Sequence, residues 1–214
     1  MKRLIAIIVL FLALYGNSFS QTGRKLSESE KPAFEQKMVE QLKKVTTLES
    51  ASLLEKTSPA TAEKSVMKGT MQYMSPSKMR WEIQTPTIST LILNGPKSVL
   101  LDKNGEKIEN EESKKLKQLG NFMIMMISGK AISQQSKMFS PEFYEIDAAQ
   151  MLVILTPINS RMKEMFNTIE LRIDQKTMLT NSITMHEKSG EKTVITLTNK
   201  VLNLTIPQDK FVIN

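Results

Sequence analysis

Regular alternation of apolar and polar residues in the segment GTMQYMSPSKMRWEIQTP, residues 69–86, constrains the fold of this chain more than any other feature. The second half of the segment places three apolar side chains on one face of a strand: Met79, Trp81 and Ile83. Arg80 and Glu82 fall on the other face, and a Ser-Pro-Ser turn separates the two halves. The pattern predicts two paired strands of a sheet that buries one face.

The same period of two recurs through the chain and predicts about ten strands. The expected strands cover residues 48–55, 65–74, 78–83, 90–93, 98–102, 142–146, 151–156, 168–174, 179–186 and 193–198. Asn94-Gly95 is a strong hairpin signal, and Asn104-Gly105 predicts a further turn. Because the strands follow one another as hairpins, we expect an antiparallel sheet, and a sheet of this size curls or closes.

Two segments have helical spacing instead. After Pro32, the side chains of Phe34, Met38 and Leu42 fall four residues apart. A second helix is expected over residues 111–129, and Gly120 permits a break within it. Its apolar stripe contains Leu116, Leu119, Phe122, Met123, Met126 and Ile127. The expected fold class is therefore α+β, with the mid-chain helix lying across the concave face of a curved antiparallel sheet.

The start of the chain has the layout of a cleavable secretory signal peptide over residues 1–20. Lys2 and Arg3 precede an apolar run, which ends before the small-residue site Ser18-Phe19-Ser20. The run is short for a membrane span, although an uncleaved anchor is the alternative. The chain contains no cysteine, which excludes a lipid-anchoring Cys and disulfides. We expect one domain over residues 21–214, located in a bacterial periplasm or outside the cell. Residues 21–31 are polar, and we expect them to form a loose leader.

The charge of the chain does not indicate a nucleic-acid partner. The net charge is +7, and it falls to +5 when Lys2 and Arg3 leave with the signal peptide. The basic residues are mixed with acidic ones, and aromatic residues make up only 6% of the chain. A nucleic-acid site would need a basic stripe with interleaved aromatics. Attraction to an anionic membrane surface stays open.

Catalytic chemistry has little support in the sequence. His186 is the single histidine, so the usual zinc sites cannot be assembled without cysteine. No Gly-x-Ser-x-Gly segment is present to position a serine nucleophile, and no pair of carboxylates has a distinctive spacing. We therefore expect neither an enzyme nor a bound cofactor or metal, with a hydrolase of lipids or glycans as a remote alternative.

Methionine is abundant, with 15 residues in the chain and a cluster at Met123, Met125 and Met126. Unbranched thioether side chains repack at low cost, which suits an apolar pocket that must both hold and release a ligand. The alternative is that these methionines fill gaps in an ordinary core.

The order of these motifs resembles the LolA family of periplasmic lipoprotein carriers. The most specific match is the string Pro76-Ser77-Lys78-Met79-Arg80-Trp81-Glu82, which follows an export signal and precedes the Asn94-Gly95 turn. Other matching pieces are the helix of Phe34, Met38 and Leu42, Gly69-Thr70-Met71, Pro86, Thr156-Pro157, residues 169–174 and the ending from Asn203 to Phe211. The resemblance implies an incomplete β-barrel that is covered by a helical lid and encloses an apolar cavity.

The resemblance also implies roles for individual residues. The expected cavity lining consists of Phe34, Met38, Leu42, Met71, Trp81, Leu119, Phe122, Met123 and Met126. Arg80 corresponds to an arginine that reaches inward in the family, bonds to the lid and helps to switch between closed and open forms. The alternative for Arg80 is a surface position paired with Glu82, and the alternative for Trp81 is an ordinary core position.

By resemblance, the chain is expected to be a monomeric carrier that shields the acyl chains of lipoproteins. It would receive them from an inner-membrane lipoprotein-releasing transporter and deliver them to an outer-membrane acceptor of unknown identity. A periplasmic lipoprotein-sensing or polypeptide-interaction module of the same fold is the alternative function.

Overall fold

The computed structural model describes residues 23–61, 63–132 and 136–213, so the predicted signal peptide lies outside the described residues. Its strands are β1 (Arg24–Lys25), β2 (Thr47–Thr57), β3 (Lys64–Met74), β4 (Lys78–Thr85), β5 (Ser89–Asn94), β6 (Lys97–Asp102), β7 (Phe139–Glu145), β8 (Gln150–Pro157), β9 (Phe166–Asp174), β10 (Thr180–Glu187) and β11 (Lys192–Leu202). The helices are α2 (Lys31–Leu42), α3 (Glu111–Ile127), α4 (Ser160–Met165) and the 3₁₀ helix η1 (Gln208–Phe211).

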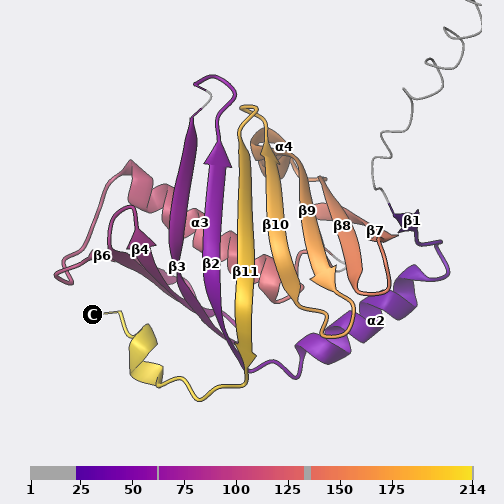
Figure 1. Cartoon of the computed structure of the whole chain (residues 1–214), viewed down its shortest axis with the longest axis horizontal. Helices are drawn as coiled ribbons and strands as arrows, with labels where there is room; N and C mark the ends of the chain where they lie inside the picture. Colours follow the sequence, from indigo (N-terminus) through magenta and orange to yellow (C-terminus); the bar gives the residue numbers. More distant parts are fainter. Residues whose placement is uncertain (1–22, 62, 133–135, 214) are drawn as a thin grey trace, which may run out of the picture.

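All the strands of the described residues belong to one antiparallel sheet with the order β1-β7-β8-β9-β10-β11-β2-β3-β4-β5-β6. Strands β2 to β6 form one meander and β7 to β11 another, and the pairing of β11 with β2 joins them (Figure 1). The sheet is not closed, because β1 and β6 lie at opposite ends of this order. The expectations of an antiparallel sheet and an incomplete barrel are confirmed.

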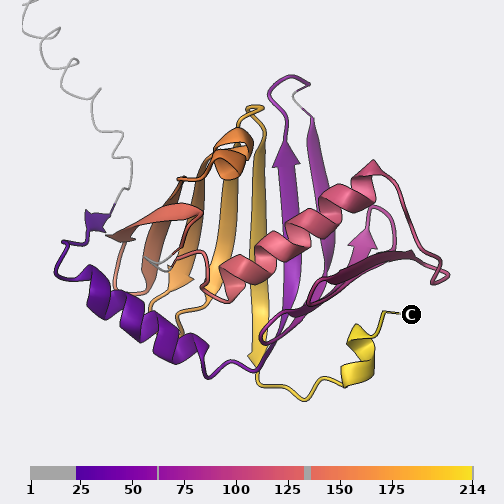
Figure 2. The same ribbon diagram turned by 180° about the vertical axis from the view of Figure 1, so that it is seen from behind.

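The mid-chain helix α3 crosses one face of the sheet diagonally, and α2 lies along the lower edge of the sheet (Figure 2). We call the face toward α3 the inner face. It carries the fully buried side chains of Met79 and Trp81, as the alternation in the sequence predicts. Met123 and Met126 of α3 belong to the same hydrophobic core. Burial of this apolar surface between sheet and helix is the main stabilising contribution to the fold.

The opposite, outer face of the sheet is partly covered by the C-terminal segment that follows β11. Phe211 and Ile206 from this segment form a small second core with Met74 of β3. Asn94 Nδ2 donates to the carbonyl of Phe211 at 3.1 Å, which ties the segment to the end of β5.

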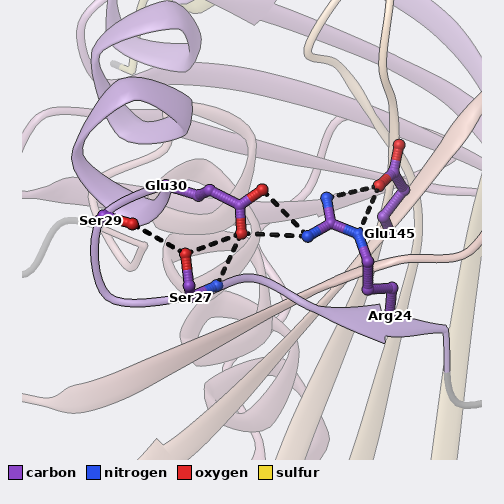
Figure 3. Close-up of polar contacts among 5 residues, drawn as sticks. All are labelled: Arg24, Ser27, Ser29, Glu30 and Glu145. Atoms are coloured by element: carbon purple, nitrogen blue, oxygen red, sulfur yellow. Dashed lines mark hydrogen bonds and ion pairs between the residues drawn. The ribbon is translucent and has the colours of Figure 1, made fainter.

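The segment before α2 is held in place more firmly than the polar composition of residues 21–31 predicts. Strand β1 pairs with β7, and Arg24 donates to Glu145 at 2.8 Å and to Glu30 at 2.9 Å (Figure 3). Hydrogen bonds from the backbone and side chain of Ser27, together with Arg24, lower the pKa of Glu30 to about 2. The expectation of a loose leader over these residues is therefore wrong from Arg24 onward, because strand pairing and charged side chains anchor it to the sheet edge.

Candidate functional site

Helix α3 begins with a reciprocal cap that the sequence encodes locally. Asn110 Oδ1 accepts a hydrogen bond from the backbone N–H of Ser113 at 2.8 Å, and Ser113 Oγ accepts one from the N–H of Asn110 at 3.1 Å. Glu111 and Glu112 in the first turn interact favourably with the positive end of the helix dipole.

The helix then continues without a break through Gly120, so the possible interruption at this position is not observed. A Cβ atom at residue 120 would lie 2.7 Å from Leu91 Cδ2 and 2.8 Å from Leu93 Cδ1. Glycine is required here for close approach of α3 to β5, and not for a turn. This contact fixes the depth at which the helix sits over the sheet.

Between α3 and the inner face lies a cavity of about 1130 Å³. It extends from strands β4 to β6 at one end to α4 and the start of β9 at the other. The apolar side chains in its wall are Leu54, Met67, Ile83, Leu100, Ile108, Leu116, Leu119, Phe122, Met125, Met162, Met165, Phe166 and Met185. Its volume is slightly above the usual range of small-molecule sites, about 300–1,000 Å³.

Two of the residues predicted to line a cavity, Leu119 and Phe122, are in this wall. Four others form the packed core beneath the helix instead: Met71, Trp81, Met123 and Met126. None of these four side chains is more than 1% exposed, because they fill the interface where α3 rests directly on the sheet. The structure therefore corrects the prediction that these four side chains line the cavity. One stripe of α3 docks on the sheet, and the neighbouring stripe faces the cavity.

The three predicted residues of α2 lie apart from the large cavity. Met38 and Leu42 line a smaller cavity of about 260 Å³ near the end of α3. Phe34 packs against Phe143 of β7, with ring centroids 5.1 Å apart. Helix α2 therefore covers the lower edge of the sheet, and its apolar side chains contribute to the core there.

Arg80 does not reach α3. Its Nε donates to Glu82 Oε1 at 2.7 Å, and its Nη1 donates to the carbonyl of Lys210 at 3.3 Å. Both contacts lie on the outer face, since Met79 and Trp81 on either side of it in β4 are buried on the inner face. The inward contact with a lid that the resemblance implies is therefore absent from this arrangement, and the alternative of pairing with Glu82 is the one observed.

Leu116 and Met125 line the cavity although neither was among the predicted lining residues. Each lies three residues from a predicted one, so helical spacing along α3 could have found them. Met162, Met185 and Leu54 come from α4, β10 and β2, and no local pattern connects these distant segments with α3.

Charged side chains surround the apolar wall in equal numbers of each sign. They are Lys56, Lys115, Arg161 and Lys188, and Glu112, Glu164, Glu187 and Glu191. Lys56 Nζ lies 2.9 Å from Glu191 Oε2, and the hydrogen bond lowers the pKa of that carboxyl below its ordinary value. The opposite charges balance, so the surroundings of the cavity favour neither a cationic nor an anionic ligand.

The one histidine of the sequence lies away from the cavity. His186 Nε2 lies 2.9 Å from Glu170 Oε1, and neither residue is part of the cavity wall. Among residues 23–61, 63–132 and 136–213, no cluster of three or more potential metal-binding side chains is found. In the same residues, no helix has the length and apolar character needed to cross a membrane.

Comparison with known proteins gives one match to a family. The model of the family described as outer membrane lipoprotein carrier protein LolA matches residues 43–214. None of the curated protein sequences matches the chain.

MucB shares the fold, and other solved structures are similar to the chain, all at low sequence identity. MucB superposes with a TM-score of 0.54 at 9% identity, covering 88% of this chain and 64% of MucB. A LolA superfamily protein from Nitrosomonas europaea has a TM-score of 0.46 at 13% identity, covering 83% of this chain and 97% of its own. LprF from Mycobacterium bovis also has a TM-score of 0.46, at 12% identity, covering 85% of this chain and 97% of LprF.

Proposed function

Because the chain belongs to the family of the outer membrane lipoprotein carrier protein LolA, we propose that it binds the acyl chains of lipoproteins and carries them between membranes. The observation that carries the proposal is the cavity of about 1130 Å³ between α3 and the sheet. Apolar side chains line both sides of it, with Leu119 and Phe122 of α3 opposite Leu54 and Met185 of the sheet. Such a wall suits hydrocarbon better than a polar ligand.

The length of the cavity supports this ligand class. From Glu112 to Met125, the cavity-lining part of α3 advances about 20 Å at 1.5 Å per residue. An acyl chain extends about 15 Å in one leaflet of a bilayer, whose hydrocarbon core is about 30 Å thick. A chain laid along α3 would bury most of its methylenes, and ten buried methylenes contribute about 8 kcal/mol.

The methionine content of the cavity wall suits release of a ligand as well as its binding. Met67, Met125, Met162, Met165 and Met185 all line the cavity. Their unbranched side chains can adjust to chains of different shape at low cost. A carrier needs this property, because a ligand that is held too tightly is not passed on.

We further propose that the protein works as a monomer in the periplasm after cleavage of residues 1–20. In this role it would receive lipoproteins from an inner-membrane lipoprotein-releasing transporter and deliver them to an acceptor at the outer membrane. Binding, and not catalysis, is the proposed activity.

A binding experiment with a matched pair of variants tests the proposal. The mature protein is titrated with a fluorescent fatty acid and, separately, with a triacylated peptide detected by native mass spectrometry. Leu119→Glu places a charge in the cavity wall and should abolish both interactions. Leu204→Glu, at a residue that is 42% exposed in the C-terminal segment, should bind as the wild type does. Failure of the wild type to bind either ligand would overturn the proposal.

Depletion in the source bacterium separates the carrier from the alternative function. Loss of a carrier should trap outer-membrane lipoproteins in the inner membrane, which membrane fractionation measures. If lipoproteins are sorted normally and only a signalling output changes, a lipoprotein-sensing or polypeptide-interaction module becomes the better assignment.

A further inference from the structure

Three phenylalanine rings meet at one end of the large cavity. The ring of Phe122 in α3 stacks on Phe166 of β9 with centroids 5.3 Å apart and an interplanar angle of 29°. Phe122 also meets the edge of Phe139 in β7, with centroids 6.0 Å apart and an angle of 73°. We call these three side chains the aromatic wall.

The aromatic wall lies at the β9 end of the cavity, because Phe166 of β9 lines the cavity and no residue of β7 or β8 does. Phe122 and Phe166 line the cavity, whereas Phe139 does not line it and is only 1% exposed. The opposite end of the cavity is formed by Leu100 and Ile108, near the start of α3. A chain lying along α3 from that end would reach the rings of Phe122 and Phe166.

The aromatic wall is also attached to rigidly held backbone. Asn159 Oδ1 caps α4 by accepting from the N–H of Met162 at 2.8 Å, and the N–H of Phe166 donates to the carbonyl of Met162. The N–H of Lys188 donates to the carbonyl of Met165 at 2.9 Å, which ties α4 to the turn between β10 and β11. Offset-stacked and edge-to-face ring contacts add further stabilisation.

The side walls of the cavity are built differently from the end at the aromatic wall. Met67 of β3, Met125 of α3 and Met185 of β10 line them, and their flexible side chains can move to accommodate a wider or narrower ligand. The width of the cavity is therefore adjustable, while its length is limited by stacked rings on fixed backbone.

We infer that the aromatic wall sets the maximum length of acyl chain that the cavity accepts. This inference rests on the proposed function and specifies its ligand further. Methylenes up to the wall are buried, and each multiplies the affinity by about fourfold. Methylenes beyond that length are not buried and add nothing to the affinity.

Competition binding with fatty acids of increasing length tests the inference. Laurate, myristate, palmitate, stearate and arachidate each displace a fluorescent fatty acid from the full mature protein. For the wild type, affinity should rise with the length of the fatty acid and then reach a plateau.

Phe122→Ala opens the aromatic wall toward Phe139, so the plateau of affinity in this variant should move to longer chains. The arachidate-to-palmitate affinity ratio should rise about 15-fold, as two more methylenes become buried. Phe122→Trp should move the plateau to shorter chains.

Leu116→Ala is the matched control, because Leu116 lines the cavity on α3 away from the aromatic wall. It should weaken binding of every fatty acid without moving the plateau. Thermal unfolding checks that each variant is folded. If Phe122→Ala unfolds, Phe122→Leu replaces it, since this variant removes the ring but keeps an apolar side chain.

Identical plateaus in wild type and Phe122 variants would overturn the inference and leave the proposed function standing. Absence of binding by the wild type at every length would overturn both.

Discussion

The indole Nε1 of Trp81 donates a hydrogen bond to Oγ of Ser52 at 2.8 Å, and both side chains are buried on the inner face of the sheet. The two residues come from β4 and β2, with β3 between them. An indole nitrogen is a donor only, and a buried donor needs an acceptor. Ser52 provides that acceptor in a region where the neighbouring side chains are apolar.

Replacing Ser52 by alanine should therefore destabilise the protein by about 1–3 kcal/mol, because the Trp81 N–H would be left buried without a partner. Denaturant unfolding followed by Trp81 fluorescence measures the change. Ser182→Ala, on β10, is the control and should change the free energy of unfolding by less than about 0.5 kcal/mol. Equal stability of Ser52→Ala and wild type would show that the hydrogen bond between Trp81 and Ser52 does not contribute to the free energy of unfolding.

Gly120→Ala should destabilise the protein, even though alanine favours a helix by about 1 kcal/mol over glycine. The new methyl group would lie 2.7 Å from Leu91 and 2.8 Å from Leu93, both fully buried, and overpacking of this kind costs about 1–3 kcal/mol. Thermal unfolding measures the net loss. Asn121→Ala, at the exposed neighbouring position, serves as the control for helix propensity. A Gly120→Ala variant as stable as this control would contradict close packing of α3 on β5.

The contribution of Glu30 to stability should depend on pH in a defined direction. Its pKa is about 2 in the folded protein, below the ordinary value of 4.5, because Ser27 and Arg24 stabilise the carboxylate. Because the pKa is lower in the folded than in the unfolded protein, the ionised carboxylate of Glu30 stabilises the folded state above pH 4.5. This stabilisation disappears as the pH falls toward 2.

Hydrogen exchange of the Leu26 amide, which bonds to the Phe143 carbonyl at 2.9 Å, reports on this anchor. At pH 6 to 7, the amide should exchange faster in Glu30→Gln than in the wild type. The difference should shrink as the pH approaches 2 and also with added salt, since both charged side chains are exposed. A difference that is independent of pH would exclude an electrostatic role for Glu30.

Arg80→Leu should leave binding of an acyl probe unchanged, because Arg80 contacts Glu82 and the Lys210 carbonyl on the outer face. It should loosen the C-terminal segment, which limited proteolysis next to Lys210 would detect as faster cleavage. Arg172→Leu, at an exposed position on β9, is the control for loss of a surface charge. A several-fold change in acyl affinity would instead favour the switching role that the family resemblance implies.

Much of the architecture could be predicted from local patterns. The alternation of Met79 and Trp81 with Arg80 fixes which face of β4 is buried, because successive side chains in a strand point to opposite faces. The Asn94-Gly95 signal marks the turn between β5 and β6, where Gly95 adopts a φ of +59°. The cap at Asn110 was not predicted, although it is encoded within four residues.

The candidate site could be predicted only in part. The apolar side chains of α3 form a broad stripe, and periodicity does not show which part of it touches the sheet. The structure assigns Met123 and Met126 to the docked part and Leu119 and Phe122 to the cavity wall. The position of Gly120 against Leu91 and Leu93 decides this rotation of the helix.

The sequence by itself determined the strands, their buried faces and the presence of an apolar helix, because these depend on side-chain spacing within one segment. The tertiary structure alone decided where the cavity lies and which contact Arg80 makes beyond its neighbour Glu82. That contact is with the Lys210 carbonyl, far along the chain, and the aromatic wall joins Phe122, Phe139 and Phe166 from three separate elements. Such contacts depend on how distant segments pack against each other, which no local pattern specifies.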